Sequence, residues 1–329
     1  MNREAITHFF IPVLGVLIGV FLGLQFIHGV FVRVQHPMTR DRIMLEALAS
    51  DETAPQLAIF GNSIAMCGVD AKRLGDSLHR TALNLATGAR NPMESLFYYK
   101  DLHDNIEVVI QFAMPSDLNI EPQMNADRYD AFRIYGYELD AQTEKILRSA
   151  FQERAGSYLD RSALKREFGA RWALRSSIDE GVRDLLRNDL SVQRSIYDLY
   201  YPCPYTKRVP EPAMKRDLAS RRERSARQTA ANPQAAEILR AMTQRTREQG
   251  RRLLFVIPPA HPEIRNNEGA VPTRLLAEFL TELAEQPGVE LLNTFDLLEA
   301  DEFVDAVHPT AAGAERLTAL LTARLGEML

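Results

Sequence analysis

Five short apolar runs, separated by longer helical patterns, constrain the fold of this chain more than any other feature. They are Leu57–Phe60, Ala82–Ala86, Val108–Ala113, Leu253–Ile257 and Glu290–Asn293. Runs of this length with helices between them are typical of parallel strands that are buried on both faces by helical layers. The sequence therefore predicts a three-layer α/β/α domain with a mostly parallel, doubly wound sheet of five strands.

The chain is long enough for one large α/β domain with an inserted segment or for two modest domains, and we expect the first of these. Between residues 119 and 249, a stretch rich in Arg, Glu and Leu interrupts the alternation of strands and helices, which indicates a mainly helical insertion. We expect an N-terminal flank (1–8), a transmembrane anchor (9–32), a linker (33–55) and an α/β domain (56–329) that contains the insertion at about 119–249.

The anchor is predicted from an uncharged apolar segment, Phe9–Ile27. At about 1.5 Å per helical residue, roughly 19 residues reach across the hydrocarbon core of a bilayer. A cleavable signal peptide is the alternative. However, its apolar region usually spans only about 7–15 residues, and Gln35–Arg40 offers no clear small-residue cleavage site. The sequence favours an uncleaved membrane helix.

Net charge and cysteine content exclude some classes of protein. The formal net charge is −5 and the sequence pI is near 5.9, so the basic stripe of a nucleic-acid-binding domain is not expected. Only Cys67 and Cys203 are present, which allows at most one bridge, in an oxidising compartment. Cys67 is otherwise interpreted as a packed small apolar residue rather than as a second nucleophile.

A candidate nucleophile follows the first apolar run. Ser63 ends the sequence Gly61-Asn62-Ser63, where a strand is expected to turn into a helix. Taken alone, this fragment is more typical of an ordinary turn or a helix N-cap.

A second polar fragment, Asp305-Ala-Val-His308, precedes the last predicted helix. Taken alone, it could be a loop that caps that helix. Because the carboxyl ends of parallel strands meet at one edge of a sheet, however, Ser63, His308 and Asp305 can converge. A histidine held by a carboxylate can remove the proton of a serine that attacks an ester.

Three blocks together resemble the SGNH (GDSL-like) hydrolase superfamily: Phe60–Ser63, Asn84–Gly88 and Asp305–His308. The resemblance covers roughly residues 57–325 outside the insertion. It implies an SGNH/flavodoxin-like fold in which Ser63 is the nucleophile, His308 is general base and then acid, and Asp305 orients the imidazole. It also implies that the backbone N–H groups near Ser63 and at Gly88 bind the oxyanion.

The third block of that family usually supplies an asparagine to the oxyanion, whereas this chain has Met114-Pro-Ser-Asp117. Ser116 or Asn119 could substitute, but losing one such donor typically costs about 10²–10³ in rate. His261, after the fourth run, could contact substrate or simply belong to a surface loop. No Cys/His cluster has metal-ligand spacing and no phosphate-binding glycine loop follows a strand, so neither a metal nor a cofactor is expected.

Two parts of the predicted insertion have ambiguous patterns. Aromatic residues and prolines alternate in Ile196–Tyr205, which could bind sugars or acyl chains but more often fastens an irregular loop to the core. Basic residues crowd the segment 215–227, which more often marks a solvated helix than a site for anionic partners.

Membrane-tethered proteins of this superfamily commonly add or remove acyl groups on envelope polysaccharides. The resemblance thus implies a serine esterase or O-acyltransferase whose substrate is an acylated, in particular an acetylated, carbohydrate or another small ester. Its partners would be the membrane and envelope polysaccharide machinery. The alternatives are a catalytically silent scaffold or carrier-binding component, and a lipid-directed lipase or thioesterase.

The location of the domain follows from function rather than from charge. Arg33, Arg40 and Arg42 follow the anchor while only Arg3 precedes it, so the positive-inside rule alone favours a cytoplasmic domain. Large domains can translocate against a modest bias of this kind. We therefore expect a single-pass membrane protein with a periplasmic catalytic domain.

Overall fold

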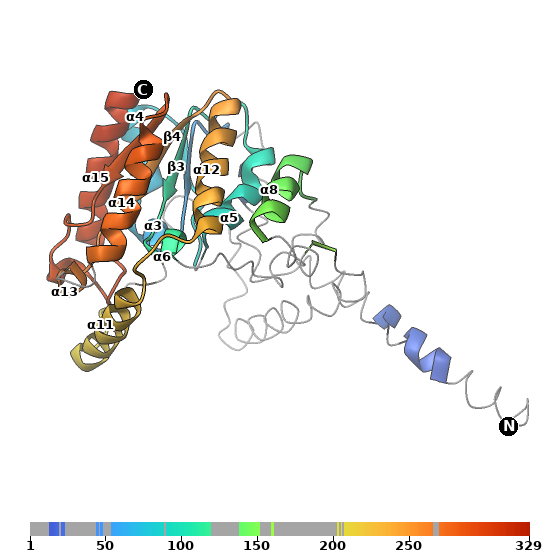
Figure 1. The fold of residues 1–329 in the computed structure, drawn as a ribbon, viewed down its shortest axis with the longest axis horizontal. Coiled ribbons are helices and arrows are strands. Elements are labelled where there is room, and N and C mark those ends of the chain that lie inside the picture. Colours follow the sequence, from blue (N-terminus) through green and yellow to red (C-terminus); the bar gives the residue numbers. More distant parts are fainter. Residues whose placement is uncertain are drawn as a thin grey trace, which may run out of the picture. The chain divides into compact units, whose positions relative to one another are not determined.

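The computed structural model describes residues 13–19, 21–23, 44–45, 47–48, 54–88, 90–119, 138–151, 159–160, 203, 205, 207–265 and 270–329. Figure 1 draws the described residues as a ribbon. The chain divides into two compact units. One comprises Met1–Asp41, Asn125–Glu138 and Arg161–Gln193. The other comprises Arg42–Met124, Leu139–Asp160 and Arg194–Leu329, and it contains the sheet and every predicted site residue.

Most of the predicted anchor lies outside the described residues. Within 9–32, residues 13–19 and 21–23 are described, and they are helical. The flank 1–8 and most of the linker 33–55 also lie outside. Among the helices of the described residues, none has both the length and the apolar character that a membrane crossing demands.

Five parallel strands form one sheet. They are β1 (Leu57–Phe60), β2 (Ala82–Asn84), β3 (Val108–Phe112), β4 (Arg252–Ile257) and β5 (Val289–Asn293). Their order is β2-β1-β3-β4-β5, and all four pairings are parallel. This arrangement confirms the five-stranded parallel sheet predicted from the apolar runs. Because the strand order reverses at β1, the loops after β1 and β3 open a crevice at the carboxyl edge.

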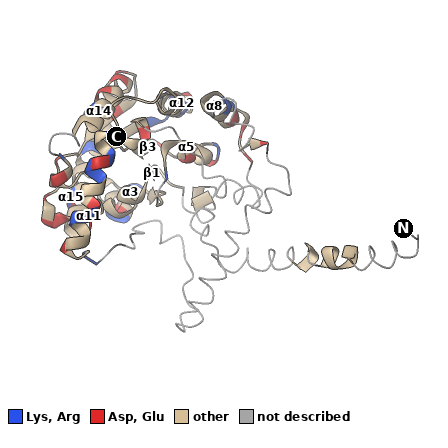
Figure 2. Cartoon of the chain, turned by 60° about the horizontal axis from the view of Figure 1, so that its bottom comes forward, with Lys and Arg blue, Asp and Glu red and all other residues tan. Residues whose placement is uncertain are grey.

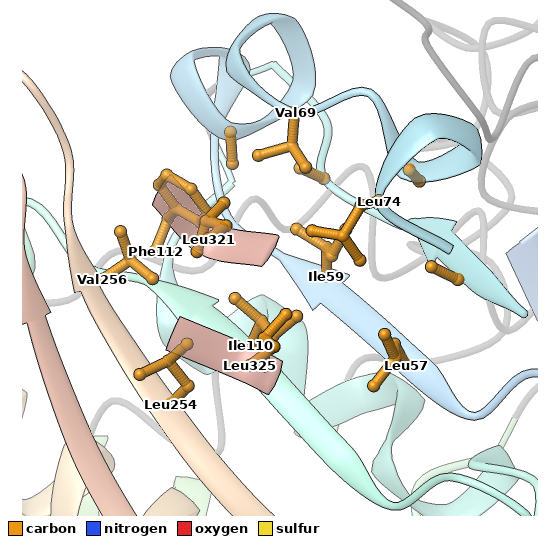
Figure 3. Close-up of a cluster of buried hydrophobic side chains, with 14 of the residues drawn as sticks. Leu57, Ile59, Val69, Leu74, Ile110, Phe112, Leu254, Val256, Leu321 and Leu325 are labelled. Atoms are coloured by element: carbon orange, nitrogen blue, oxygen red, sulfur yellow. The ribbon is translucent and has the colours of Figure 1, made fainter. Parts of the chain in front are cut away.

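One face of the sheet is covered by α3 (Ser63–Gly68), α4 (Ala71–Leu78) and α15 (Ala311–Met328). Alternate strand residues, including Ile59, Ile110 and Leu254, point into this layer and meet Leu321 and Leu325 of α15 (Figure 3). Leu317 belongs to the same buried cluster. The last helix therefore supplies much of the core on this face, which holds the loop before α15 against the sheet.

The opposite face is covered by α5 (Pro92–Ser95), the 3₁₀ segment η1 (Leu96–Asp101), α12 (Pro233–Glu248) and α14 (Ala270–Ala284). Right-handed crossovers place these connections on the side away from α4. Phe60 points this way, its ring centroid 6.1 Å from that of Tyr98 and 5.9 Å from that of Tyr99. The sheet is thus enclosed by helical layers on both faces.

The remaining helices are α6 (Ser116–Asn119), α8 (Ala141–Phe151), α11 (Glu211–Ala226), α13 (Pro262–Arg265) and the 3₁₀ turn η5 (Ala300–Glu302). Three described helices, α8, α11 and α12, fall within the predicted insertion. Of these, α12 packs on β4 and so forms the crossover between β3 and β4. Residues 120–137, 152–158 and 161–202 of this interval lie outside the described residues.

Candidate active site

The turn between β1 and α3 presents Ser63 at the carboxyl edge of the sheet. Gly61 has φ +146°, and a Cβ there would lie 2.7 Å from the Cβ of Phe112, so only glycine fits. Asn62 caps α3, since its side-chain oxygen accepts a hydrogen bond from the Ile64 N–H at 2.9 Å. The N-cap interpretation of this fragment is therefore correct, and the capped turn also places a partly exposed serine at the crevice.

Asn84, in the second sequence block, fixes the far end of the same short helix. Its side chain is fully buried, and its Nδ2 donates to the carbonyl oxygens of Ala65, Met66 and Val69 at 3.1, 3.3 and 2.9 Å. Its Oδ1 accepts a hydrogen bond from the Ala86 N–H at 3.2 Å. Carbonyls at a helix C-terminus lack partners within the helix, so this one amide holds α3 in place against β2.

The loop that carries Asp305 and His308 is closed at its base. Phe303 and Pro309 form an antiparallel bridge, and the Val304 N–H donates to the His308 carbonyl oxygen at 2.9 Å. Thr310 then caps α15, accepting a hydrogen bond from the Gly313 N–H at 3.2 Å. Because the loop is pinned at both ends, its side chains have a defined position relative to α3.

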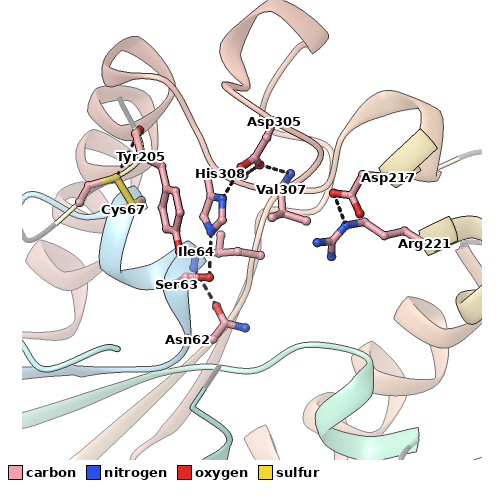
Figure 4. A network of polar contacts seen from close by, with 11 residues as sticks. Asn62, Ser63, Ile64, Cys67, Tyr205, Asp217, Arg221, Asp305, Val307 and His308 are labelled. Carbon is pink, nitrogen blue, oxygen red and sulfur yellow. Dashed lines mark hydrogen bonds and ion pairs between the residues drawn. A yellow bond between two sulfur atoms is a disulfide. The ribbon is translucent and has the colours of Figure 1, made fainter. Parts of the chain in front are cut away.

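A chain of hydrogen bonds links the carboxylate, the imidazole and the hydroxyl group (Figure 4). Asp305 Oδ2 lies 2.7 Å from His308 Nδ1, and His308 Nε2 lies 2.8 Å from Ser63 Oγ. With its proton on Nδ1, the imidazole donates to Asp305 and accepts from the Ser63 hydroxyl. Residues separated by 245 positions in the sequence thus meet at one edge, as the strand order requires.

Asp305 is held in its charged form. Burial raises the pKa of this carboxyl, but the hydrogen bond from the His308 side chain and those from the backbone N–H groups of His308 and Val307 outweigh burial, so the pKa lies below its ordinary value. The two backbone bonds to Oδ1 measure 2.8 and 2.9 Å. The carboxylate can therefore orient the imidazole and balance a positive charge on it.

An apolar pocket of about 200 Å³ is lined by chain neighbours of Ser63 and His308, although Ser63, Asp305 and His308 are not themselves among its described lining residues. Ile64, which follows Ser63, and Val307, which precedes His308, form part of its wall. Other apolar walls come from the loops after the strands; they include Pro258, Pro259 and Phe295. Two arginines of α11, Arg221 and Arg224, also line the pocket. Asp217 lies 3.0 Å from the guanidinium group of Arg221 and 4.0 Å from that of Arg224. The pocket thus combines apolar walls with a positively charged side.

Most basic residues of the segment 215–227 lie on the solvated face of α11. Lys215 lies 2.6 Å from Glu211, and Arg227 pairs with Glu223 one turn earlier. Acidic and basic residues are interspersed along α11, α14 and α15 (Figure 2). Only Arg221 and Arg224 of this group line the pocket.

The predicted oxyanion residues differ in where they lie. Ser116, the first residue of α6, lines the pocket. Asn119, at the end of α6, instead directs its Nδ2 to the Pro272 carbonyl oxygen of α14, 3.4 Å away. Gly88 lies exposed in the turn after β2, where an added Cβ would meet no atom of the described residues within 4 Å, so close approach to those residues does not account for this glycine.

His261 follows β4 and is buried rather than exposed on a surface loop. Its ring packs at a tilt on Phe303, with centroids 5.3 Å apart, and its Nδ1 accepts a hydrogen bond from the Glu263 N–H at 3.2 Å. Burial lowers the pKa of this histidine and favours the neutral ring. His261 is not among the described residues that line the pocket, and its contact with Phe303 lies at the base of the loop that carries Asp305.

Three further features near the site could not be located from the sequence, although the sequence marked Cys203 as a possible bridge partner and placed Tyr205 in an aromatic segment. Burial, reinforced by the charge of Glu94 and opposed by the Met114 N–H, raises the pKa of Asp117 to about 7. Cys203 is bonded to Cys67 of α3, which forms the bridge that the sequence left open. Tyr205 stacks on His308, with ring centroids 4.0 Å apart. The disulfide and the stack of Tyr205 on His308 join residues far apart in the sequence, so no local pattern reports them.

Among the described residues, no group of three or more His, Cys, Asp or Glu side chains is placed to hold a metal ion. The polar groups at this edge include the chain of Ser63, His308 and Asp305, and Arg221 and Arg224 line the pocket.

Comparisons with known proteins find similarity in structure but not in sequence families. No family model matches the sequence, and no curated protein matches it. Among solved structures, the chain is similar to a Streptococcus pneumonia protein provisionally described as a platelet activating factor. The two share 12% sequence identity with a TM-score of 0.43, and the match covers 92% of this chain and 98% of the other.

Proposed function

We propose that this protein is a serine-dependent ester hydrolase or O-acyltransferase. The observation that carries the proposal is the continuous chain from Asp305 through His308 to Ser63, with contacts of 2.7 and 2.8 Å. A hydroxyl, an imidazole and a carboxylate in this order are the components that nucleophilic acyl transfer needs.

The first half-reaction transfers the acyl group to the protein. Ser63 Oγ attacks the ester carbonyl carbon while His308 Nε2 takes the hydroxyl proton, and Asp305 balances the imidazolium charge. When the tetrahedral intermediate collapses, the ester bond breaks and the leaving alcohol takes the proton from Nε2.

In the second half-reaction, water or a sugar hydroxyl attacks the acyl-serine and gives its proton to Nε2, and Ser63 regains this proton as the acyl group departs. The acceptor decides between hydrolysis and transfer.

Backbone and side-chain donors near Ser63 would stabilise the oxyanion. The Ile64 N–H is already bonded to Asn62, whereas the Ser63 N–H makes no hydrogen bond within the described part of the chain. We assign the Ser63 N–H as the main donor, with the Ser116 hydroxyl, which lines the pocket, as the second. Gly88 is a third candidate from its place in the sequence, and we assign no oxyanion role to Asn119.

The apolar pocket beside Ser63 would hold the acyl group. Apolar walls with a few polar groups are typical of small-molecule sites. The position of Ile64 and Val307 in those walls supports an acyl group that enters between α3 and the loop of His308. An acetylated envelope polysaccharide fits this proposal, and the sugar would remain outside the pocket.

An oxidising compartment is part of the same proposal. The Cys67–Cys203 bridge supports it, because disulfides form and persist outside the cytoplasm. Together with the apolar segment Phe9–Ile27, it supports a membrane-anchored domain that faces the periplasm, in contact with polysaccharide machinery.

A fluorophosphonate probe that reacts with activated serines tests the function. The wild-type protein should be labelled, and Ser63→Ala should abolish labelling. His308→Ala should reduce the labelling rate by at least about 10³-fold, since the hydroxyl loses its base. A matched control, Ser77→Ala, alters an exposed serine of α4 that is not among the described residues lining the pocket, and it should leave labelling intact. Assays on acetyl esters and acetylated glycans would then separate hydrolysis from transfer.

A catalytically silent scaffold is the second candidate. Serine in place of the usual third-block asparagine favours it, because Ser116 reaches less far than an amide side chain. An unlabelled wild-type protein whose Ser63→Ala variant keeps its cellular role would establish this alternative. A lipase or thioesterase would instead be labelled and would prefer long acyl chains.

A further inference from the structure

The side chain of Tyr205 covers one face of the His308 imidazole. The two ring planes are inclined by only 14°, and their centroids lie 4.0 Å apart, so the rings are stacked (Figure 4). The tyrosine is 42% exposed, so a large part of its surface faces solvent. Because so much of this residue is exposed, contacts elsewhere in the same segment must help to keep Tyr205 stacked on His308.

A covalent tether lies two residues before the tyrosine. Cys203 is bonded to Cys67, which is fully buried in α3, the helix that begins at Ser63. On the other side of the tyrosine, the Val209 N–H donates to the Val304 carbonyl oxygen at 2.8 Å. The segment is therefore fastened on one side to the helix of Ser63 and on the other to the loop of His308.

The stack restrains the imidazole in a direction that its hydrogen bonds do not. Asp305 and Ser63 engage the two ring nitrogens in the plane of the ring, which leaves tilting of the ring less restricted. An aromatic face packed parallel to the imidazole opposes that tilt and excludes water from one side. The same face also attracts the imidazolium that forms when Ser63 loses its proton.

We propose that Tyr205 is a positioning residue for His308, and that the Cys67–Cys203 disulfide is the tether that keeps it in place. The proposal rests on the proposed function, because it assigns His308 the role of base. It predicts that the rate of the chemical step depends on an aromatic ring at position 205 and on an intact disulfide. The alternative is that Tyr205 only fastens the segment to the domain.

Two substitutions separate these roles in the full-length protein. Tyr205→Phe keeps the ring, whereas Tyr205→Leu keeps apolar bulk but removes the aromatic face. The measurement is the rate of fluorophosphonate labelling at increasing probe concentration, which separates the limiting rate from half-saturation. We expect Tyr205→Leu to lower the limiting rate about 3- to 30-fold with half-saturation unchanged, and Tyr205→Phe to remain within about twofold of wild type.

Reduction of the Cys67–Cys203 disulfide tests whether the tether is needed to keep Tyr205 in place. Dithiothreitol should lower the limiting rate of the wild-type protein in the same direction as Tyr205→Leu. It should have no effect on the Cys67→Ser/Cys203→Ser double variant, which should already label slowly. Circular dichroism at the assay temperature would verify that each variant is folded.

The failures of the two proposals are distinguishable. A folded wild-type protein that is not labelled would overturn the proposed function and this inference with it. Labelling of a folded Tyr205→Leu variant at the wild-type limiting rate would overturn the inference alone. If Tyr205→Leu does not fold, equal limiting rates for the oxidised and reduced wild-type protein would overturn it as well.

Discussion

At the scale of single residues, Gly61 and Gly88 are glycines under different constraints. Both follow strands, and both belong to sequence blocks that suggested a function. Gly61 has a positive φ and no room for a Cβ, whereas a Cβ at Gly88 would meet no atom of the described part of the chain within 4 Å. The shape of the turn before Ser63 thus depends on one glycine, and the turn after β2 tolerates a side chain.

We expect Gly61→Ala to lower the free energy of unfolding by about 1–3 kcal/mol or more, because the added methyl group clashes with Phe112 and strains the backbone. The matched control, Gly88→Ala, should change it by less than about 0.5 kcal/mol. Urea denaturation of both variants measures the difference. Equal stabilities would contradict the geometry of the β1–α3 turn.

The raised pKa of Asp117 predicts that the stability of the protein depends on pH. Its pKa in the folded state is about 7, against an ordinary value of 3.8. Between these values the folded protein binds more protons than the unfolded chain, so the contribution of this group to stability falls as pH rises from about 4 to 7.

The Asp117→Asn variant should lack this contribution. Because water reaches part of the side chain, we expect the difference in the free energy of unfolding between variant and wild type to change by roughly 1–3 kcal/mol across that range, in favour of the variant at high pH. Denaturation at pH 4.5, 6 and 8 gives the comparison. A difference that stays constant with pH would exclude a raised pKa.

At the scale of elements, α3 depends on a side chain from another strand. The helix has only six residues, and the amide of Asn84 contacts three of the carbonyl groups at its C-terminal end. Short helices are marginal on their own, so tertiary contacts of this kind determine where Ser63 points.

Asn84→Ala should therefore affect both stability and the site. We expect a loss of about 2–4 kcal/mol in the free energy of unfolding, because buried carbonyls lose their donor, and slower fluorophosphonate labelling of the folded fraction. Asn232→Ala, which removes the cap of α12, provides the control. It should cost about 1 kcal/mol and leave the labelling rate unchanged. Normal labelling by a folded Asn84→Ala variant would contradict the role of Asn84.

The elements also explain how far the sequence could predict the structure. Strands such as Val108–Phe112 are buried on both faces, so their apolar runs are visible in the sequence and their bounds were predicted within two residues. Ser63, Asp305 and His308 could be placed together because parallel strands end at one edge. The orientation of Asn119, the burial of His261 and the stacking of Tyr205 depend on packing between distant segments. No local periodicity encodes such contacts.

At the scale of the whole molecule, one covalent bond joins parts of the chain that are 136 residues apart. In the chain-entropy model, closing a loop of that length stabilises the folded state by about 5 kcal/mol, although measured effects are usually about 2–4 kcal/mol. The bond therefore links the fold to the redox state of its compartment. A domain made in a reducing compartment would lack this contribution.

The state of these cysteines predicts where the domain resides. If it is periplasmic, both thiols of the full-length chain should resist a maleimide reagent when cells are lysed in denaturant, and both should react after reduction. The Cys67→Ser/Cys203→Ser variant should react in neither case, which verifies that the signal comes from this pair. A reporter active only outside the cytoplasm, fused after Leu329, should give signal in the same cells. Free thiols together with a silent reporter would place the domain in the cytoplasm, where its substrate could not be a polysaccharide beyond the membrane.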